Sequence, residues 1–276
     1  MRIIQITDTH LSRGKPHFAD NWPPLARWIA AERPDLVIHT GDVTVDGAAV
    51  DDDLSYAAGL LRGLGVRWLA VPGNHDIGDA LHPPQPVNRE RLARWQAHFG
   101  PDRWVEDVAD WRLVGINAML LGSDEPEEAA QDAWLDRVMA GANGRPVAWF
   151  LHKPLYLNSP EEADVGLSVK PRPRARLLAL VRRYQVALVA SGHLHKAHEL
   201  RCGETRFVWA PASSFLIGEI QPAMAGEKLL GAVLYELDRT ALTARITEIP
   251  GLARHWLDDV IGEVYPRPPK DQPPKG

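Results

Sequence analysis

The sequence predicts an α/β fold in which parallel strands alternate with helices. Short apolar runs bounded by glycine or proline alternate with stretches of helical periodicity over most of the chain. The first of these runs, residues 2–7, alternates little between polar and apolar residues, which is typical of strands covered on both faces. The repeated order of strand and helix therefore indicates parallel pairing with right-handed crossovers.

The first part of the chain carries three strands, each followed by a helix. In order, we expect strand 2–7, helix 25–33, strand 35–40, helix 51–62, strand 66–71 and helix 88–98. Pro34 ends the first helix. The acidic residues that begin the second helix suit the positive end of a helix dipole. Segments 11–24 and 78–87 are rich in proline, so we expect loops there.

The second part adds a second sheet and ends in a tail. We expect paired strands 104–108 and 112–117, helix 127–140, strand 146–151, loop 153–173, helix 174–184, strand 186–190 and then strands 206–210, 229–237 and 241–248. The Pro- and Lys-rich segment 266–276 is expected to be disordered. Because no internal repeat or boundary interrupts the rest, residues 1–265 are predicted to be a single domain.

Composition excludes several classes of protein. A formal charge of −5 argues against a nucleic-acid surface, which is usually basic. The single cysteine, Cys202, excludes an intrachain disulfide framework and fits a reducing compartment. Charged residues follow the N-terminus too closely to leave room for the apolar core of a signal peptide. No run reaches the roughly 18 apolar residues of a membrane span. We therefore expect a cytoplasmic protein with a small-molecule substrate and neither nucleic acid nor membrane as a partner.

Residues that can bind metal ions follow the predicted strands. Asp42 lies just past strand 35–40, where open α/β sheets bind their ligands, and Gly41 permits the sharp turn there. The full set of ligand-capable residues after strands is Asp8, His10, Asp42, Asn74, His75, His152, His193 and His195. This mixture of carboxylate, imidazole and amide groups suits manganese, iron or zinc better than calcium. A sheet common to these strands would bring their loops together at one edge.

The order of these motifs resembles a known superfamily. The chain contains D-x-H at Asp8, G-D at Gly41, G-N-H-D at Gly73, a single histidine at His152 and G-H-x-H at Gly192. This series resembles the calcineurin-like metallophosphoesterases, and most closely the bacterial class III cyclic-nucleotide phosphodiesterases and glycerophosphodiesterases. The resemblance covers about residues 1–215. It implies a four-layer α/β/β/α sandwich of two mixed sheets, with a dinuclear metal site at one edge.

The resemblance also implies a role for each motif residue. It assigns Asp8, His10 and His195 to one divalent metal, Asn74, His152 and His193 to the other, and Asp42 to a bridge between them. A metal-bridging water or hydroxide would be the nucleophile, because two cations lower its pKa and neutralise the phosphate oxygens. His75 would bind no metal. It would hold a phosphate oxygen or protonate the departing alkoxide.

Other residues near the motifs have open roles. Asp46 could orient His75, although many relatives carry an acidic residue one position earlier, where this chain has Val45. Asp76 could equally close its own loop. His39 lies inside a predicted strand, which favours a histidine packed in the core.

A second set of candidates lies in loops beside the motifs. Lys153, Lys170, Arg172 and Arg174 could receive a second charge of the substrate, or simply lie on a solvated loop. Asn117 occupies a position where relatives often have an Asp-Ser pair near the site, so it could contact substrate. The strands after residue 199 could pair between subunits, which allows a homo-oligomer.

The favoured function is a dinuclear phosphodiesterase that hydrolyses a small soluble diester, such as a cyclic nucleotide or a glycerophosphodiester. The alternative is a phosphomonoesterase or nucleotide pyrophosphatase on the same scaffold, because loops rather than the fold decide the substrate. A nuclease fits poorly with the acidic balance of the chain. A scaffold protein without catalysis usually lacks motif residues, and this chain keeps all of them, His75 included.

Overall fold

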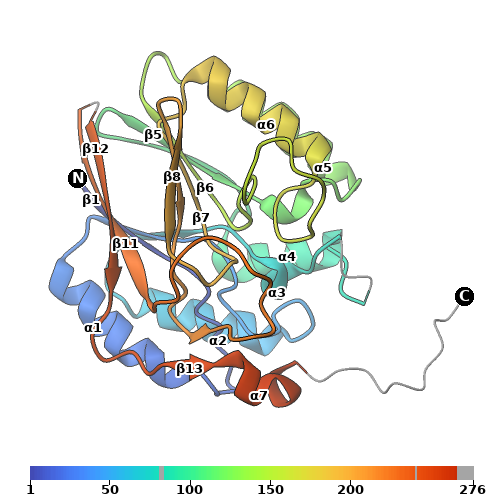
Figure 1. The fold of residues 1–276 in the computed structure, drawn as a ribbon, viewed down its shortest axis with the longest axis vertical. Coiled ribbons are helices and arrows are strands. Elements are labelled where there is room, and N and C mark those ends of the chain that lie inside the picture. Colours follow the sequence, from blue (N-terminus) through green and yellow to red (C-terminus); the bar gives the residue numbers. More distant parts are fainter. Residues whose placement is uncertain (81–83, 240, 266–276) are drawn as a thin grey trace, which may run out of the picture.

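Two β-sheets, each mixing parallel and antiparallel strands, form the centre of the protein (Figure 1). The computed structural model describes residues 1–80, 84–239 and 241–265, so the predicted tail 266–276 lies outside the described residues. The first sheet has the order β12-β11-β1-β2-β3, and the second has the order β4-β5-β6-β7-β9-β8. The predicted pair of mixed sheets is confirmed.

The first sheet contains the three N-terminal strands and two late ones. Its members are β1 (Arg2–Ile6), β2 (Leu36–His39), β3 (Trp68–Ala70), β11 (Gly231–Asp238) and β12 (Ala241–Glu248). Strands β1, β2 and β3 are parallel, as predicted, with Ile4 opposite Val37 and Val37 opposite Trp68. Strand β11 runs antiparallel to β1, and β12 runs antiparallel to β11.

The second sheet is built from the middle of the chain. Its members are β4 (Trp104–Val108), β5 (Trp111–Ile116), β6 (Val147–Leu151), β7 (Leu188–Ser191), β8 (His198–Cys202) and β9 (Thr205–Trp209). The predicted pair β4 and β5 is antiparallel, and β5, β6, β7 and β9 are parallel. The strands after residue 199 thus pair within this chain, and pairing of those strands between subunits is not needed to complete either sheet.

Helices cover the outer faces of the two sheets. They are α1 (Trp22–Glu32), α2 (Asp51–Arg62), α3 (Asn74–Ile77), α4 (Arg89–Phe99), α5 (Pro126–Ala140), α6 (Pro171–Tyr184) and α7 (Leu257–Val264). Helices α1 and α2 lie against the first sheet, and α5 and α6 against the second (Figure 1). This is the expected four-layer arrangement. Helix α6 begins three residues earlier than predicted because Pro171 is tolerated in a first turn, where its missing N–H would be unpaired anyway.

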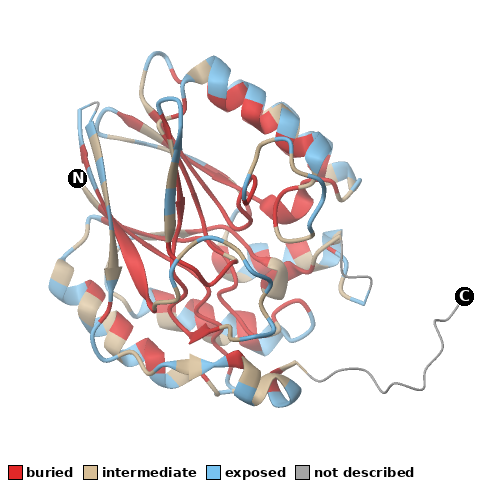
Figure 2. Cartoon of the chain, viewed as in Figure 1, coloured by how far each residue is buried: buried red, intermediate tan, exposed pale blue. Residues whose placement is uncertain are grey.

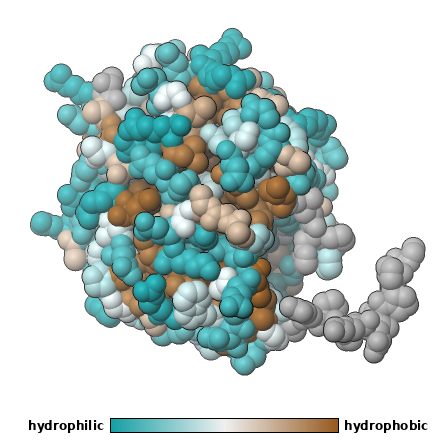
Figure 3. Space-filling view, in the orientation of Figure 1, coloured by the Kyte–Doolittle hydropathy of each residue, from teal (hydrophilic) through white to brown (hydrophobic). Residues whose placement is uncertain are grey.

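The core lies between and around the sheets (Figure 2). Alternate residues of β1 divide between two layers: Ile3 faces the second sheet, whereas Ile4 and Ile6 pack with the helices. Trp104 links the two sheets, because its indole N–H donates a 2.8 Å hydrogen bond to the carbonyl of Ala70. The face of the molecule shown in Figure 3 is mostly hydrophilic, with apolar side chains in small patches.

Several described elements were not predicted from the sequence, among them strand β8 and helix α7. Helix α3 is a single turn at the G-N-H-D motif. Strands β10 (Phe215–Leu216) and β13 (His255–Trp256) form a short parallel pair that brings α7 to the site end of the molecule. Within the described residues, no helix combines the length and the apolar character needed to cross a membrane.

Candidate metal centre

The predicted metal ligands all follow the carboxyl ends of strands, in loops or, for Asn74, in the one-turn helix α3, and two sheets supply them. The first sheet supplies Asp8, Asp42 and Asn74, and the second supplies His152, His193 and His195. The expectation of one common sheet is therefore wrong. The site forms because the two sheets pack face to face with these strand ends at the same edge, where open sheets bind ligands.

The backbone of the ligand loops is held in an unusual conformation. Five ligand residues that are not glycine have positive φ angles: Asp8 (52°), His10 (42°), Asp42 (50°), His193 (71°) and His195 (51°). Such residues cost about 1–3 kcal/mol each and persist only where the surrounding structure imposes them. Hydrogen bonds between loops do so here, including the 3.0 Å bond from the Asp8 N–H to the Gly41 carbonyl. This clustering indicates a functional constraint.

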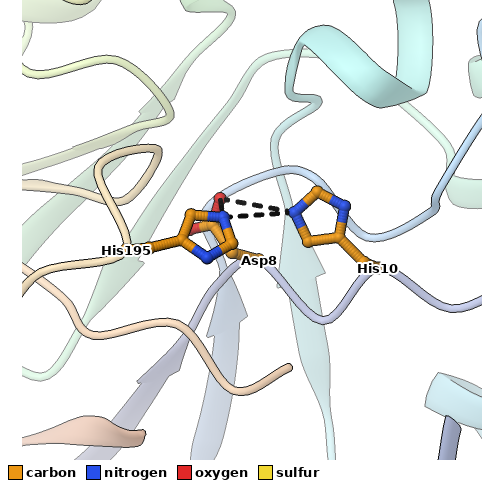
Figure 4. Close-up of side chains that lie close together, drawn as sticks. All are labelled: Asp8, His10 and His195. Atoms are coloured by element: carbon orange, nitrogen blue, oxygen red, sulfur yellow. Dashed lines mark hydrogen bonds and ion pairs between the residues drawn. The ribbon is translucent and has the colours of Figure 1, made fainter. Parts of the chain in front are cut away.

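One group of three side chains converges on a shared point. Asp8, His10 and His195 point toward one another (Figure 4). The Nε2 atoms of His10 and His195 are 3.3 Å apart, and Asp8 Oδ1 lies 3.4 Å from the Nε2 of His195. Asp8 Oδ1 is buried and has no hydrogen-bond partner. A buried unpaired carboxylate oxygen facing two imidazole nitrogens is a donor set that fits a divalent cation.

A second group lies around His152. Its Nε2 atom is 3.2 Å from Asp42 Oδ2, 3.2 Å from Asn74 Oδ1 and 3.1 Å from His193 Nδ1. Asp42, His152 and His193 together could hold an ion, and the amide oxygen of Asn74 adds a fourth oxygen or nitrogen donor. The donors again fit a borderline divalent metal.

Asp42 lies between the two groups. Its Oδ2 atom is 3.2 Å from His152 Nε2 and 3.9 Å from His10 Nε2, so one oxygen faces both sets. Its Oδ1 atom accepts a 2.8 Å hydrogen bond from the backbone N–H of His75. The family resemblance assigned the bridge to Asp42, whose carboxylate oxygen lies between the two donor groups.

The buried carboxylates of this centre remain ionised. Burial alone would raise the pKa of Asp8, but His195 and His152 hold it well below its usual range. Burial would lower the pKa of His152, but Asp42 and Asp8 outweigh that effect and raise it to about 9. Burial lowers the pKa of His10 well below its usual value. Ionised carboxylates thus attract positive charge to the centre, and divalent cations can supply it in place of a proton on His152.

Glycines let these loops approach one another. Gly41 has a φ of 92°, and a Cβ atom there would lie 2.7 Å from both the backbone nitrogen of Gly73 and the Nδ1 of His152. A Cβ on Gly73 would collide with the carboxylate and the backbone nitrogen of Asp42. The glycines of the G-D and G-N-H-D motifs are therefore needed for packing at the centre.

His75 lies beside the two groups and belongs to neither. Its Nδ1 atom is 3.1 Å from the carbonyl oxygen of Val45, which fixes the ring. Its Nε2 atom is 4.0 Å from Asp42 Oδ2, and the side chain keeps 26% of its exposure to solvent. Since one nitrogen remains without a hydrogen bond to protein among the described residues, His75 can serve a bound substrate, as the resemblance suggested.

The structure shows what Asp46, Asp76 and His39 contact. Asp46 does not orient His75, because its carboxylate accepts a 2.9 Å bond from Gln85 and faces Lys15. The Val45 carbonyl does so instead. Asp76 closes its loop: its buried carboxylate accepts the backbone N–H groups of Val43, Thr44 and Gly73. His39 is buried and pairs with Thr9 at 2.9 Å, which confirms a core histidine.

The remaining candidates for substrate contact are directed elsewhere. Asn117 is buried and bonds to Asp102 and to the backbone of Met119, so the proposed substrate contact is wrong. Lys153 is buried in an ion pair with Asp79.

Three other basic residues of the same loop region also have protein partners. Lys170 donates to the carbonyl of Gly122 at 2.6 Å. The exposed Arg172 pairs with Asp124 at 2.9 Å, and the buried Arg174 pairs with Glu162 at 3.5 Å. None of these groups lines the pocket at the centre.

A pocket of about 270 Å³ opens onto the centre. Beyond the metal-ligand set and His75, its lining is mostly apolar. Leu194 lies within the G-H-x-H motif, and the other lining residues come from segments that the sequence did not assign to the site: Leu167, Phe215, Ile217, Ile220, Gln221, Pro222, Met224, Leu257 and Tyr265. Among the described residues that line it, none is lysine or arginine. The only sequence signals for these segments are the apolar residues of loop 217–224 and the helical spacing of 257–264.

Comparisons with known proteins agree with this geometry. Residues 1–197 match the model of the calcineurin-like phosphoesterase family. The chain is 28% identical, over 216 residues, to a "Probable glycerophosphodiester phosphodiesterase GpdQ" from Arcobacter nitrofigilis, covering 71% of this chain and 72% of that protein. It is 30% identical, over 235 residues, to the 3',5'-cyclic adenosine monophosphate phosphodiesterase CpdA of Escherichia coli, covering 77% and 76% of the two chains.

A solved structure shows the same fold. The crystal structure of a dimetal phosphatase from Danio rerio superposes with a TM-score of 0.60 at 14% sequence identity. The superposition covers 89% of this chain and 95% of the phosphatase. At such low identity the likeness concerns the fold alone.

Proposed function

This chain belongs to the calcineurin-like phosphoesterase family, and we propose that this metal-dependent phosphoester hydrolase is a phosphodiesterase with two divalent metals at its centre. One observation carries the proposal. Two sets of buried nitrogen and oxygen donors converge on either side of one carboxylate oxygen, Asp42 Oδ2. A single metal would leave one of these donor sets without a cation.

The side chains of the centre would have different roles in metal binding and catalysis. Asp8, His10 and His195 would hold one ion, Asn74, His152 and His193 the other, with Asp42 shared. When bound, two divalent ions activate water and neutralise charge on the phosphoryl oxygens. His75 is the free acid or hydrogen-bond donor: the Val45 carbonyl fixes its Nδ1, so Nε2 is directed to the pocket side of Asp42. There it would stabilise a phosphoryl oxygen or protonate the leaving alkoxide.

The lining of the pocket favours a diester over a monoester. A diester carries one negative charge, which two cations can balance, whereas a monoester dianion gains more from an added arginine or lysine. None is present among the described lining residues, and Lys153 is already neutralised by Asp79. A small soluble diester, such as a cyclic nucleotide or a glycerophosphodiester, fits best. Phosphomonoester or nucleotide pyrophosphate hydrolysis is the alternative.

A matched substrate comparison tests this function. The purified enzyme, loaded separately with Mn²⁺, Fe²⁺ and Zn²⁺, is assayed on bis(p-nitrophenyl) phosphate and p-nitrophenyl phosphate, which share a leaving group, and on cyclic AMP and glycerophosphocholine. We expect a higher kcat/KM for the diester of the matched pair. A monoester preference with every metal would refute the diester assignment and support the alternative. Elemental analysis should find two metal ions per chain.

A further inference from the structure

The histidines of the centre differ in how the fold holds their outer nitrogens. His152 Nδ1 lies 2.7 Å from the carbonyl oxygen of Thr40, and His195 Nδ1 lies 2.9 Å from the carbonyl oxygen of Phe215. Both partners are backbone groups that no substitution removes. His10 Nδ1 instead lies 2.9 Å from the side-chain hydroxyl of Tyr265, which is 255 residues away in the chain. The outer hydrogen bond of His10 thus depends on one removable side chain.

The ring of Tyr265 also touches the neighbouring histidine. Its centroid lies 4.6 Å from that of His75, with an angle of 36° between the planes. His10 and His75 meet edge to face at 5.0 Å. The three rings therefore form one contact group. Within it, Tyr265 limits the rotation of His10, a candidate metal ligand, and of His75, the candidate acid.

Helix α7 delivers Tyr265 and is anchored independently of that hydroxyl. Asp258, in its first turn, accepts the backbone N–H groups of Gly218, Glu219 and Ile220 at 2.6–3.2 Å. Lys15 donates to the carbonyl of Val264 at 2.7 Å. The apolar face of α7 packs in a cluster with residues of other segments, which are Phe18, Val45 and Phe215. Removing the hydroxyl alone should therefore leave the helix in place.

We propose that Tyr265 is a positioning residue of the metal centre, whose hydroxyl fixes the ring of His10 while its ring fixes that of His75. With His10 Nε2 facing the centre, Nδ1 carries the proton and donates to the Tyr265 oxygen. This is the interaction by which an outer partner sets the tautomer and orientation of a metal-binding histidine. Helix α7 thereby completes a centre whose candidate metal ligands and His75 lie between residues 8 and 195. The inference rests on the proposed dinuclear centre.

Metal titration separates this role from a merely structural one. Full-length protein is stripped with chelator and titrated with Mn²⁺ in a calorimeter, as wild type, Tyr265→Phe and Tyr265→Ala. Loss of an outer partner typically weakens metal binding about 10–100-fold. We expect that loss in one of the two binding steps for Tyr265→Phe, with the other step unchanged. At saturating Mn²⁺ the Phe variant should recover kcat, whereas the Ala variant should not, because its His75 has lost the adjoining ring.

The matched control is Tyr235→Phe, which removes a buried hydroxyl bonded to Gln5 at 2.7 Å, away from His10. It should bind Mn²⁺ as the wild type does. If the wild type binds two Mn²⁺ ions and both Tyr265 variants bind them equally well, the positioning role is overturned and the proposed function stands. If the wild type itself fails to bind two ions, the dinuclear centre is wrong, and this inference fails with it.

Discussion

Replacement of His75 by alanine should separate catalysis from metal binding. The imidazole lies outside both donor groups, and its backbone N–H, which binds Asp42 Oδ1 at 2.8 Å, survives in the alanine variant. Asp42 should therefore keep its position and both ions should remain. The variant loses the nitrogen that faces the pocket, together with the Nδ1 bond to Val45 and the ring contacts with His10 and Tyr265. Loss of an acid–base group slows a reaction by about 10²–10⁴-fold, which corresponds to roughly 3–5 kcal/mol in the activation free energy.

The assay measures kcat and KM on bis(p-nitrophenyl) phosphate together with metal content by elemental analysis, for wild type and His75→Ala. His98→Ala is the control, because it removes a histidine that pairs with the exposed Asp51 on another part of the surface. We expect two ions in all three proteins and a fall in kcat only in His75→Ala. An empty metal site in that variant, or a loss of less than about tenfold, would show that His75 has been given the wrong role.

Three other changes have expected outcomes. Asp42→Ala removes the shared oxygen, so elemental analysis should find reduced metal content along with lost activity; full occupancy by two ions would contradict the bridge. Gly73→Ala places a Cβ against Asp42 and should weaken Mn²⁺ binding in calorimetry, whereas Gly59→Ala, whose Cβ would meet nothing within 4 Å, should not. Burial would raise the pKa of Asp258, but the backbone donors of residues 218–220 lower it. A lowered folded-state pKa stabilises the protein above the unfolded value and is lost as the pH falls through the folded one. Asp258→Asn should therefore lower Tm at pH 7, with a difference from wild type that shrinks below about pH 4; a constant difference would contradict this assignment.

Local sequence patterns predicted the side chains that converge at the candidate centre and the order of the strands before them. Short apolar runs that end at Gly41, Gly73 and Gly192 are local signals, because strand, turn and ligand lie within a few residues of one another. The carboxyl ends of parallel strands then place the ligands at a sheet edge. Because its signals are also local, helix α2 was predicted with its observed bounds, Asp51–Arg62.

Which side chains from distant parts of the sequence contact this centre depends on the tertiary structure. Asp46 and Lys153 are close to the motifs in sequence, and Asn117 ends a predicted strand, yet each is bound to a partner that the sequence could not identify. The shared edge of two sheets likewise depends on their packing face to face. Tyr265 shows the opposite case: it carries no motif and follows the matched residues by a long interval, but the short β10–β13 pair and α7 bring its hydroxyl to His10. Local patterns encode strands, turns and nearby ligands, whereas contacts across 255 residues depend on how the two ends of the chain pack together.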